Sequence, residues 1–131
     1  MTLIDTSAWI EFFRRRGDPT TKTRVATLIE LGEAAFCGPI EFELLTGARS
    51  SERRDINRAL DYSHLLDFPR ECWQRAAKIE QSVRRRGVMV PRDDILVAAT
   101  ALHHDVAVYA IDPHFELLVK RGRVRLDLYR A

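Results

Sequence analysis

The sequence has few cysteines and no long hydrophobic segment. Its two cysteines, Cys37 and Cys72, lack the spacing of a metal-binding motif. We interpret each as a small buried side chain in a reducing compartment. No apolar run approaches the about 20 residues that span a bilayer, and the amino-terminal segment lacks the basic and apolar parts of a secretory signal. We therefore expect a cytoplasmic protein without a membrane partner.

The sequence also lacks the signatures of several enzyme classes. It contains no glycine-rich phosphate loop and no serine-centred nucleophile elbow. A phosphatase with an aspartyl nucleophile needs a second acid two residues after the first, and two residues after Asp5 stands Ser7. The formal net charge is only +2, so overall charge does not by itself indicate a nucleic-acid partner. The function has to be inferred from local patterns.

The composition is typical of one globular domain, which we place at residues 1–131. Hydrophobic residues make up 46% and charged residues 31%, and this length allows a sizeable core. Strand and helix signals alternate without a linker or repeat, which favours an α/β fold with a parallel sheet covered on both faces. Strands are predicted at 2–5, 34–37, 65–68, 107–111 and 124–128. Helices are predicted from about 7 to a break at 17–19, and at about 21–31, 39–47, 51–62, 71–86, 93–104 and 115–121.

Four acidic residues occur where predicted strands end or helices begin. Asp5 follows the first strand, and Asp112 follows the near-continuous apolar run 106–111. Carboxyl ends of parallel strands share one edge of a sheet, so these two side chains lie together if their strands are neighbours. Glu43 and Asp94 stand near the starts of two predicted helices. Together the four acids indicate a carboxylate pocket for a divalent metal ion.

Two of these acids have an acidic neighbour that competes for the same role. Helical periodicity puts Glu41 and Glu43 on nearly opposite faces, so at most one points into a given pocket. Gly47 lies one turn after Glu43 and leaves space beside its carboxylate, which favours Glu43 as the member that points into the pocket. Spacing alone leaves this role and a solvated surface position for both glutamates equally open. In the second pair, one of Asp93 and Asp94 suffices to cap the helix while the other serves the pocket, and spacing leaves their order open.

Most basic residues are arginines, and they occur in clusters. The clusters are Arg14–Arg16, Arg49 with Arg53 and Arg54, Arg84–Arg86 with Arg92, and Arg121, Arg123 and Arg125. A single cluster is typical of solvated helix ends. Around an acidic pocket, the same arginines would form a track for a phosphate backbone, because the planar guanidinium matches phosphate geometry. We select Arg49, Arg53 and Arg92 as the candidate backbone-binding residues.

Four short segments follow one another along the chain: residues 4–7, 43–47, 94–101 and 112–115. In this order they resemble the PIN-domain ribonucleases, specifically the VapC-type toxins of bacterial toxin–antitoxin pairs. The resemblance covers essentially the whole chain. It implies a three-layer α/β/α fold around a central, mainly parallel sheet of four to five strands. It also implies that Asp5, Glu43, Asp94 and Asp112 are catalytic, and that Asp5, Asp94 and Asp112 hold the metal ion.

The resemblance further implies an endoribonuclease that acts on transfer or ribosomal RNA, is neutralised by a VapB-type antitoxin and forms a homodimer. It suggests that Thr6 or Ser7, besides capping the first helix, orients Asp5 or a metal-bound water. Two positions depart from the family pattern. Ala110 stands where a Thr or Ser often precedes the last acid, and His114 replaces an additional Asp after it. The changes affect a supporting hydrogen bond and any fifth carboxylate, but not the four-acid core.

The oxygen-only ligand set decides which chemistry we expect. Two ionised carboxylates about 4 Å apart repel by roughly 4 kcal/mol at an effective dielectric constant of about 20, so four together favour a cation. Carboxylate ligands favour Mg²⁺ or Mn²⁺ over zinc, which more often binds His or Cys. A water molecule activated by such an ion can attack the phosphodiester without a covalent enzyme intermediate.

The aromatic residues of the first helix keep a second class of function open. Helical spacing places Trp9, Phe12 and Phe13 in one broad stripe, which belongs either to the core or to a partner groove. In the alternative function, the chain is a non-catalytic interaction domain of PIN-like fold whose acids bind a basic partner segment. By resemblance the two functions coexist, since the antitoxin packs a segment over the toxin and can insert a basic side chain among the acids. We therefore predict that these three residues contact the antitoxin.

Overall fold

A four-stranded parallel sheet forms the centre of the protein. The structure is a computed structural model, and it describes residues 1–129. The strands are β1 (Thr2–Ile4), β2 (Ala34–Cys37), β3 (His64–Leu66) and β4 (Ala107–Tyr109), in the spatial order β3-β2-β1-β4. All three strand pairings are parallel, as the sequence predicts.

The position of β1 decides where two of the acids meet. β1 pairs with β2 on one side and with β4 on the other, and Ile4 lies beside Tyr109. Directly after β1, the backbone N–H of Asp5 donates a 2.9 Å hydrogen bond to the carbonyl oxygen of Tyr109. Asp5 therefore leaves the sheet beside the end of β4, from which the chain continues to Asp112.

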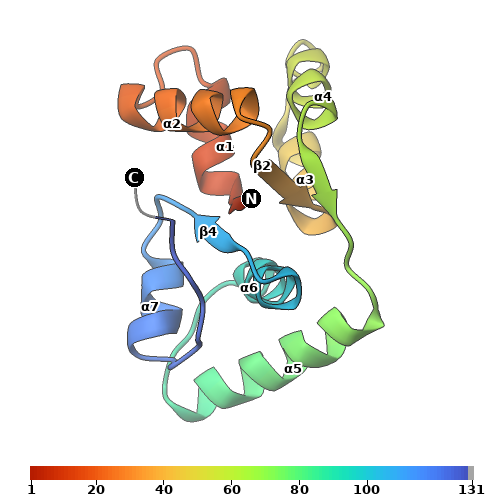
Figure 1. Cartoon of the computed structure of the whole chain (residues 1–131). Helices are drawn as coiled ribbons and strands as arrows, with labels where there is room; N and C mark the ends of the chain where they lie inside the picture. The colour runs from red at the N-terminus through yellow and green to blue at the C-terminus, as the bar shows by residue number, and fades with distance from the viewer. Residues whose placement is uncertain (130–131) are drawn as a thin grey trace.

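Helices cover both faces of this sheet. Within residues 1–129 they are α1 (Thr6–Phe13), α2 (Pro19–Glu30), α3 (Gly38–Gly47), α4 (Arg53–Asp61), α5 (Arg70–Arg85), α6 (Arg92–His104) and α7 (His114–Lys120). α1 packs against α2 and α3, and α6 packs against α3, α5 and α7. Figure 1 shows α1 and α2 on one side of the strands and α5 and α6 on the other. This confirms the predicted three-layer α/β/α arrangement.

The core extends along the strands and nearly the whole length of α6. Side chains of β1 and β2 are buried on both faces, as expected for a parallel sheet between two helical layers. In α6, Val97, Ala98 and Ala99 have no exposed surface. A helix that is apolar nearly all round is typically buried in this way. The carboxylate of Asp94, in the first turn of α6, is shielded from water as a consequence.

The predicted fifth strand at 124–128 is wrong. Leu128 forms a single parallel bridge with Val108 of β4. The N–H of Val108 donates to the carbonyl oxygen of Asp127 at 2.9 Å, and the N–H of Tyr129 donates back to the Val108 carbonyl at 2.8 Å. Shortly after α7 the chain turns at Arg123, whose φ of 55° lies in the left-handed region, so only the last part of the segment reaches β4.

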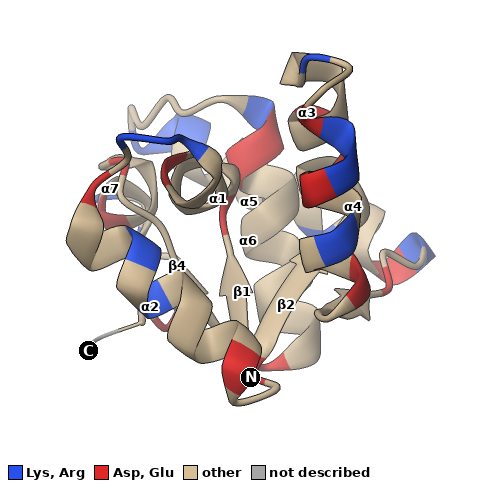
Figure 2. Cartoon of the chain, turned by 90° about the horizontal axis from the view of Figure 1, so that it is seen from above, with Lys and Arg blue, Asp and Glu red and all other residues tan. Residues whose placement is uncertain are grey.

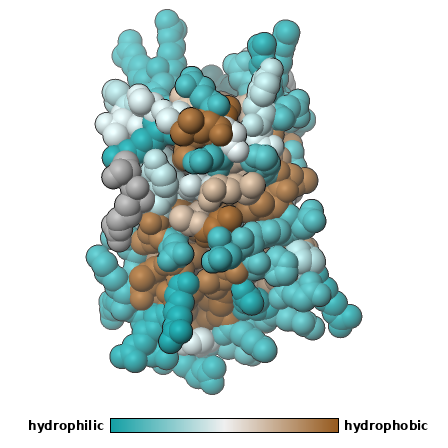
Figure 3. Space-filling view, in the orientation of Figure 1, coloured by the Kyte–Doolittle hydropathy of each residue, from teal (hydrophilic) through white to brown (hydrophobic). Residues whose placement is uncertain are grey.

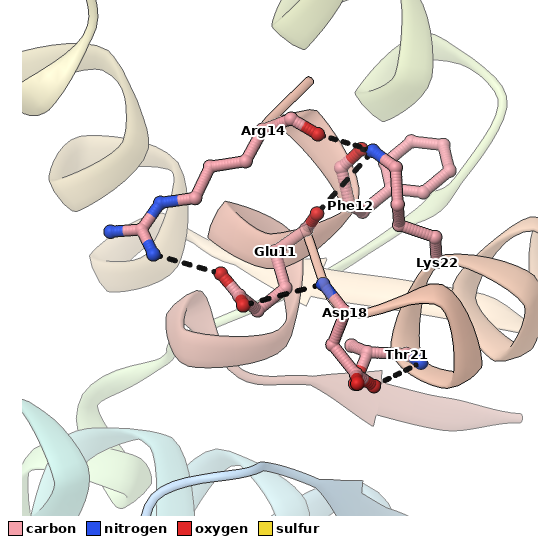
Figure 4. A network of polar contacts seen from close by, with 6 residues as sticks. All are labelled: Glu11, Phe12, Arg14, Asp18, Thr21 and Lys22. Carbon is pink, nitrogen blue, oxygen red and sulfur yellow. Dashed lines mark hydrogen bonds and ion pairs between the residues drawn. The ribbon is translucent and has the colours of Figure 1, made fainter. Parts of the chain in front are cut away.

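A polar network fixes the carboxyl-terminal end of α1 to α2, as Figure 4 shows. The ammonium group of Lys22 donates to the carbonyl oxygen of Phe12 at 2.8 Å and also to that of Arg14. Asp18 caps α2, because it accepts hydrogen bonds from the N–H and the hydroxyl of Thr21 at 2.9 and 2.8 Å. These contacts hold α1 in place, and with it the direction in which its amino-terminal end meets the sheet.

The aromatic stripe of α1 faces mainly the core. Trp9 has no exposed surface, and its ring stacks on Phe13 with centroids 5.8 Å apart and lies edge-on to Phe12 at 6.1 Å. The direct antitoxin contact expected of Trp9 is incompatible with this packing, because no partner reaches the ring. Phe12 and Phe13 are only partly buried and stay candidates for such a contact.

Several large apolar side chains remain on the surface. Phe42, Tyr62, Leu65, Trp73 and Met89 are each more than half exposed. Figure 3 shows apolar side chains gathered across the middle of one face, between hydrophilic margins. None of the described helices combines the length and hydropathy that crossing a bilayer requires. Exposed apolar groups of this kind are candidates for contacts with another protein chain.

Candidate metal-binding active site

The four predicted acids come from separate elements and converge. Asp5 follows β1, Glu43 lies on α3, Asp94 in the first turn of α6, and Asp112 in the loop between β4 and α7. Asp112 lies close enough to Asp5 and Asp94 to raise the pKa of both, and Asp94 raises the pKa of Glu43. Figure 2 shows acidic segments near the end of β1 and on α3. The four carboxyl groups therefore lie near enough to one another to interact, and the potential ligand atoms of Asp94 and Asp112 lie within 4.8 Å of each other.

Asp5 is the most deeply buried of the four acids, with 2% of its surface exposed. Burial raises its pKa to about 7, and the charge of Asp112 contributes in the same direction. Hydrogen bonds from Ser7 oppose this shift: its N–H donates to Oδ2 of Asp5 at 3.1 Å and its hydroxyl at 2.8 Å. A nearby cation would further stabilise the ionised carboxylate.

The start of α1 differs from the expected capping pattern. The sequence predicts Thr6 or Ser7 as the cap, but the helix begins at Thr6 and Asp5 is the N-cap residue. Both hydroxyls therefore lie inside the first turn and are free for other contacts. The Ser7 hydroxyl accepts a 3.2 Å hydrogen bond from the N–H of Ile111 while it donates to Asp5. It thereby ties the start of α1 to the loop that carries Asp112.

Glu43 is joined to the cluster by Thr6. The hydroxyl of Thr6 donates a 2.9 Å hydrogen bond to Oε1 of Glu43. Partial burial raises the pKa of Glu43, the bond from Thr6 lowers it, and the carboxyl groups of Asp93 and Asp94 raise it further. A Cβ at Gly47 would meet no heavy atom within 4 Å, which agrees with the space that the sequence predicts there. The structure therefore places Glu43 at the cluster with open space one turn away.

The sequence suggests that one of Asp93 and Asp94 caps α6 while the other serves the pocket, but neither residue caps the helix. The N-cap residue of α6 is Pro91, and no side chain makes a capping hydrogen bond there. Because α6 begins at Arg92, both acids fall in its first turn. Asp94 is 8% exposed and Asp93 is exposed, yet both lie near enough to Glu43 to raise its pKa. Asp93 thus borders the cluster, a position that the sequence did not assign to it.

Asp94 contains the unsatisfied atom of the cluster. Its Oδ2 is buried and accepts no well-formed hydrogen bond from the described residues, although Nδ1 of His114 lies 2.6 Å away. Burial raises the pKa of Asp94 to about 6; the charge of Asp112 adds to this increase and His114 opposes it. Leaving a buried acceptor without a partner costs about 1–3 kcal/mol, and more for a charged group. Such an atom fits a site that is built to bind a cation.

His114 belongs to the cluster, and the sequence interpretation missed it. The sequence indicates only the loss of an acid at this position, whereas the backbone N–H of His114 donates to Oδ1 of Asp112 at 2.9 Å and its ring Nδ1 lies 3.4 Å from the same oxygen. One potential ligand atom each from Asp94, Asp112 and His114 lies within 4.8 Å of the others. The available signal was its place two residues after Asp112, at the start of a predicted helix.

The donor set fits a divalent cation. Asp5, Asp94 and Asp112 offer carboxylate oxygens, which suit Mg²⁺ and Mn²⁺. His114 lies close enough to add a ring nitrogen. Oδ2 of Asp94 is buried and lies 2.6 Å from Nδ1 of His114, so a cation bound here would meet a carboxylate and an imidazole together. The cluster is therefore suited to metal-assisted chemistry on a phosphate ester.

A groove opens beside the acidic cluster, with a volume of about 430 Å³. It runs between α1, α3 and α4, and Glu43 and Arg49 lie along it. Ile10, Phe13 and Ile56 contribute apolar surface. The groove therefore offers a carboxylate, a guanidinium and apolar side chains to whatever binds there.

The other two candidate arginines have different surroundings. Arg53 is exposed at the first residue of α4. Arg92, the first residue of α6, forms an ion pair with Glu80 at 2.9 Å, and Arg84 pairs with the same glutamate at 2.9 Å. The Arg92 side chain is 78% exposed, so the pair is open to solvent. Surface ion pairs of this kind contribute little to the stability of the fold.

Family comparison identifies the class of protein that this fold and site define. A model of the PIN domain matches residues 2–120. The chain belongs to the PIN domain family. It is 33% identical to VapC ribonuclease Mb1587 of Mycobacterium bovis, over 99% of this chain and 100% of that protein. Ribonuclease VapC11 of Mycobacterium tuberculosis matches with the same identity and coverage.

Solved structures of low sequence identity share the fold. VapBC2 from Rickettsia felis, bound to a DNA fragment from its promoter, matches with a TM-score of 0.80 and 14% identity, over 98% of this chain and 96% of that chain. FitAcB from Neisseria gonorrhoeae matches with a TM-score of 0.78 and 18% identity, over 99% and 97% of the two chains. At this identity the likeness establishes the α/β/α architecture alone.

Proposed function

We propose that this protein is a metal-dependent endoribonuclease toxin of the VapC type, neutralised by a VapB-type antitoxin. The observation that carries the proposal is the convergence of Asp5, Glu43, Asp94 and Asp112, of which Asp94 and Asp112 have potential ligand atoms within 4.8 Å of each other. Full-length relatives that are named VapC ribonucleases support the substrate class. No observation favours the alternative of a non-catalytic interaction domain that binds a basic segment.

Asp5, Asp94 and Asp112 are the residues that would hold the ion, Mg²⁺ or Mn²⁺. When bound, such an ion supplies charge stabilisation at the phosphodiester and acidifies a water molecule. Glu43 accepts the proton of the attacking water, because its raised pKa brings it closer to neutral pH. Thr6 orients Glu43 through its hydroxyl.

The roles of Ser7 and the phosphate-binding arginines follow from their positions. Ser7 fixes the Asp5 carboxylate and the loop before Asp112 in one arrangement. Arg49, which shares the groove with Glu43, holds the RNA backbone beside the cluster, and Arg53 and Arg92 extend this contact. We propose transfer or ribosomal RNA as the substrate class, because the shared family pattern points to it.

The antitoxin would occupy the groove beside the cluster. Ile10 is 40% exposed there and Phe13 lines the same wall, so apolar side chains of a bound segment would pack against them. Phe12 lies next to Phe13, with ring centroids 5.2 Å apart, and supports its position. A basic side chain of the segment would then reach Glu43 and the neighbouring acids. Such a segment blocks RNA and metal from the same surface.

Three further properties belong to the proposal. The chain acts as one domain over residues 1–131, supported by the core cluster that the buried residues form within 1–129. It forms a homodimer, supported by exposed apolar side chains such as Phe42 and Trp73. It works in the cytoplasm, where RNA is available and where its free cysteines, Cys37 and Cys72, stay reduced.

Mapping of RNA ends tests the proposal. Purified, metal-free protein is incubated with total transfer and ribosomal RNA in Mg²⁺, in Mn²⁺ or with a chelator, and new ends are sequenced. We expect internal cleavage at a small set of positions that requires a divalent ion and disappears in Asp5→Asn. Cleavage that persists in the chelator, or in the folded Asp5→Asn variant, would contradict the proposed chemistry. Ends confined to one RNA class identify the substrate.

A further inference from the structure

We propose that His114 is a ligand of the metal site, together with Asp94 and Asp112, and that its imidazole makes the site favour Mn²⁺ over Mg²⁺. The inference adds a nitrogen donor to the all-carboxylate set and specifies which ion the site prefers. It rests on the metal site of the proposed function, but does not depend on RNA cleavage.

The position of the His114 ring carries the inference. Its Nδ1 lies 2.6 Å from Oδ2 of Asp94 and 3.4 Å from Oδ1 of Asp112, so it stands between two carboxylates that come from different elements. A ligand atom from each of these three residues lies within 4.8 Å of the other two. The Asp94 oxygen nearest to the ring is buried and accepts no well-formed hydrogen bond from the described residues.

The backbone around His114 holds this ring in place. His114 is the first residue of α7, and its N–H donates to the Asp112 carboxylate at 2.9 Å. The next residue, Phe115, is 1% exposed and anchors the helix in the core. The His114 side chain itself is 37% exposed, so an ion can approach it from solvent. Ligands fixed by packing and by hydrogen bonds to other ligands need little rearrangement on binding.

The nitrogen donor determines the preferred ion. Mg²⁺ is a hard cation that takes oxygen ligands, keeps several waters and gives up its hydration reluctantly. Imidazole suits transition ions, and Mn²⁺ accepts carboxylate oxygens as well. A site with Asp94, Asp112 and His114 therefore stabilises Mn²⁺ more than a site with three carboxylates does. Replacing the imidazole by a carboxylate should shift the preference toward Mg²⁺.

A counter-ion role for His114 makes the opposite prediction. In that role the protonated ring neutralises Asp94 and Asp112 and has to leave when an ion binds. Removing the ring would then strengthen the binding of Mn²⁺ and Mg²⁺ by similar factors, and their ratio would stay the same. The ratio of the two affinities thus separates a ligand from a counter-ion.

Calorimetric titration of metal-free protein with Mn²⁺ and with Mg²⁺ measures this ratio. The proteins are wild type, His114→Asp and the matched control His103→Asp, which changes an exposed histidine near the far end of α6. We expect His114→Asp to lower the preference for Mn²⁺ by about tenfold or more, a size typical of changes at a metal site. His103→Asp should leave the ratio unchanged. An unchanged ratio in His114→Asp would overturn the proposal.

Electron paramagnetic resonance of bound Mn²⁺ tests the ligand without relying on a stable variant. With ¹⁵N-labelled histidine in the wild-type protein, we expect a nitrogen hyperfine coupling that is absent in His114→Ala and retained in His103→Asp. Bound Mn²⁺ without this coupling, or a wild type that binds no Mn²⁺, would overturn the assignment. Coupling in a protein that cleaves no RNA leaves the ligand in place and removes the proposed function. RNA cleavage without the nitrogen coupling supports the proposed function but removes His114 from the metal ligands.

Discussion

The hydroxyl of Thr6 donates a 2.9 Å hydrogen bond to Glu43, across 37 positions of the sequence. This bond connects Thr6, the first residue of α1, to the middle of α3. Thr6 follows Asp5 directly in the chain. The same bond lowers the pKa of Glu43, which burial raises. The start of α1 therefore positions two acids at once: Asp5 through Ser7, and Glu43 through Thr6.

Removing the Thr6 hydroxyl tests whether this bond prepares Glu43 for catalysis. Thr6→Val keeps the shape of the side chain and should lower the RNA cleavage rate by about tenfold, while stability changes by roughly 1–2 kcal/mol. The pH of half-maximal rate should move upward, because ionised Glu43 loses a stabilising donor. Thr27→Val, which removes a hydroxyl bonded within α2, serves as control. Equal pH–rate profiles for both variants would show that the bond is only structural.

Acid pH should stabilise the metal-free protein through Asp5. Its pKa is about 7 in the folded state against an ordinary value of 3.8, so the folded state binds the proton more tightly. This contribution is fully present below pH 3.8 and is lost as the pH rises toward 7. The pKa values of Asp94 and Glu43 are also raised in the folded protein, so both residues contribute to stability in the same direction.

Comparison with Asp5→Asn isolates this contribution. At pH 8 without metal, the variant should be more stable than wild type by roughly 1–4 kcal/mol, and the difference should shrink as the pH falls to 4. Saturating Mn²⁺ should make the wild type more stable than Asp5→Asn, since only the wild type is stabilised by binding the ion. Denaturant unfolding at several pH values measures all of these differences. A variant that is less stable than wild type at pH 8 without metal would disprove that the buried, ionised Asp5 carboxylate destabilises the metal-free fold.

Two exposed arginines should contribute to RNA affinity. Arg49→Gln and Arg53→Gln should weaken the binding of a catalytically inactive protein to RNA, and each should reduce the slope of log affinity against log salt by about 1. Arg92→Gln should have a smaller effect, because Glu80 already pairs with Arg92. Filter binding over a range of salt concentrations gives these slopes. The exposed Lys78 on α5 offers the control Lys78→Gln, and an equal loss there would indicate non-specific attraction.

The groove wall should decide antitoxin affinity. Ile10→Ser should weaken antitoxin binding by about tenfold or more with little change in stability, because Ile10 is 40% exposed. Trp9→Ala should instead destabilise the fold by about 3–5 kcal/mol, because its ring is fully buried. Leu31→Ser, at an exposed position after α2, is the matched control. Affinities and unfolding curves of the same preparations separate the two effects. Unchanged antitoxin affinity in Ile10→Ser would place the inhibitory surface elsewhere.

The parallel direction of the strands and two of the acids were predictable because the relevant signals are local, whereas the adjacency of β1 and β4 was an assumption. A short apolar strand ends at Asp5, and another comes shortly before Asp112. Neighbouring parallel strands then place both residues at one edge. Asp94 was likewise marked as an acid at the start of a nearly all-apolar helix. The choice of Glu43 and Asp94 over their neighbours followed from family resemblance, since helical spacing left both pairs open.

The parts that sequence did not predict depend on contacts between distant segments. The ring of His114 meets Asp94 only because α7 and α6 come together, and its place two residues after Asp112 does not by itself show that the two helices meet. The burial of Trp9 depends on how α1 packs on the sheet. The failed strand at 124–128 depends on a turn at Arg123, a residue type that rarely adopts positive φ. Each outcome was decided by tertiary packing.

The most direct test of the account is the RNA cleavage rate as a function of Mg²⁺ or Mn²⁺ concentration for wild type, Asp94→Asn and Asp105→Asn. Asp105 follows the other end of α6 in a left-handed conformation that Asn also tolerates, so its variant is a matched control. We predict saturable, metal-dependent cleavage by wild type and Asp105→Asn, and a fall of about a hundredfold or more in folded Asp94→Asn. Cleavage by folded Asp94→Asn at the wild-type rate would contradict the central claim that this carboxylate cluster performs metal-dependent RNA hydrolysis.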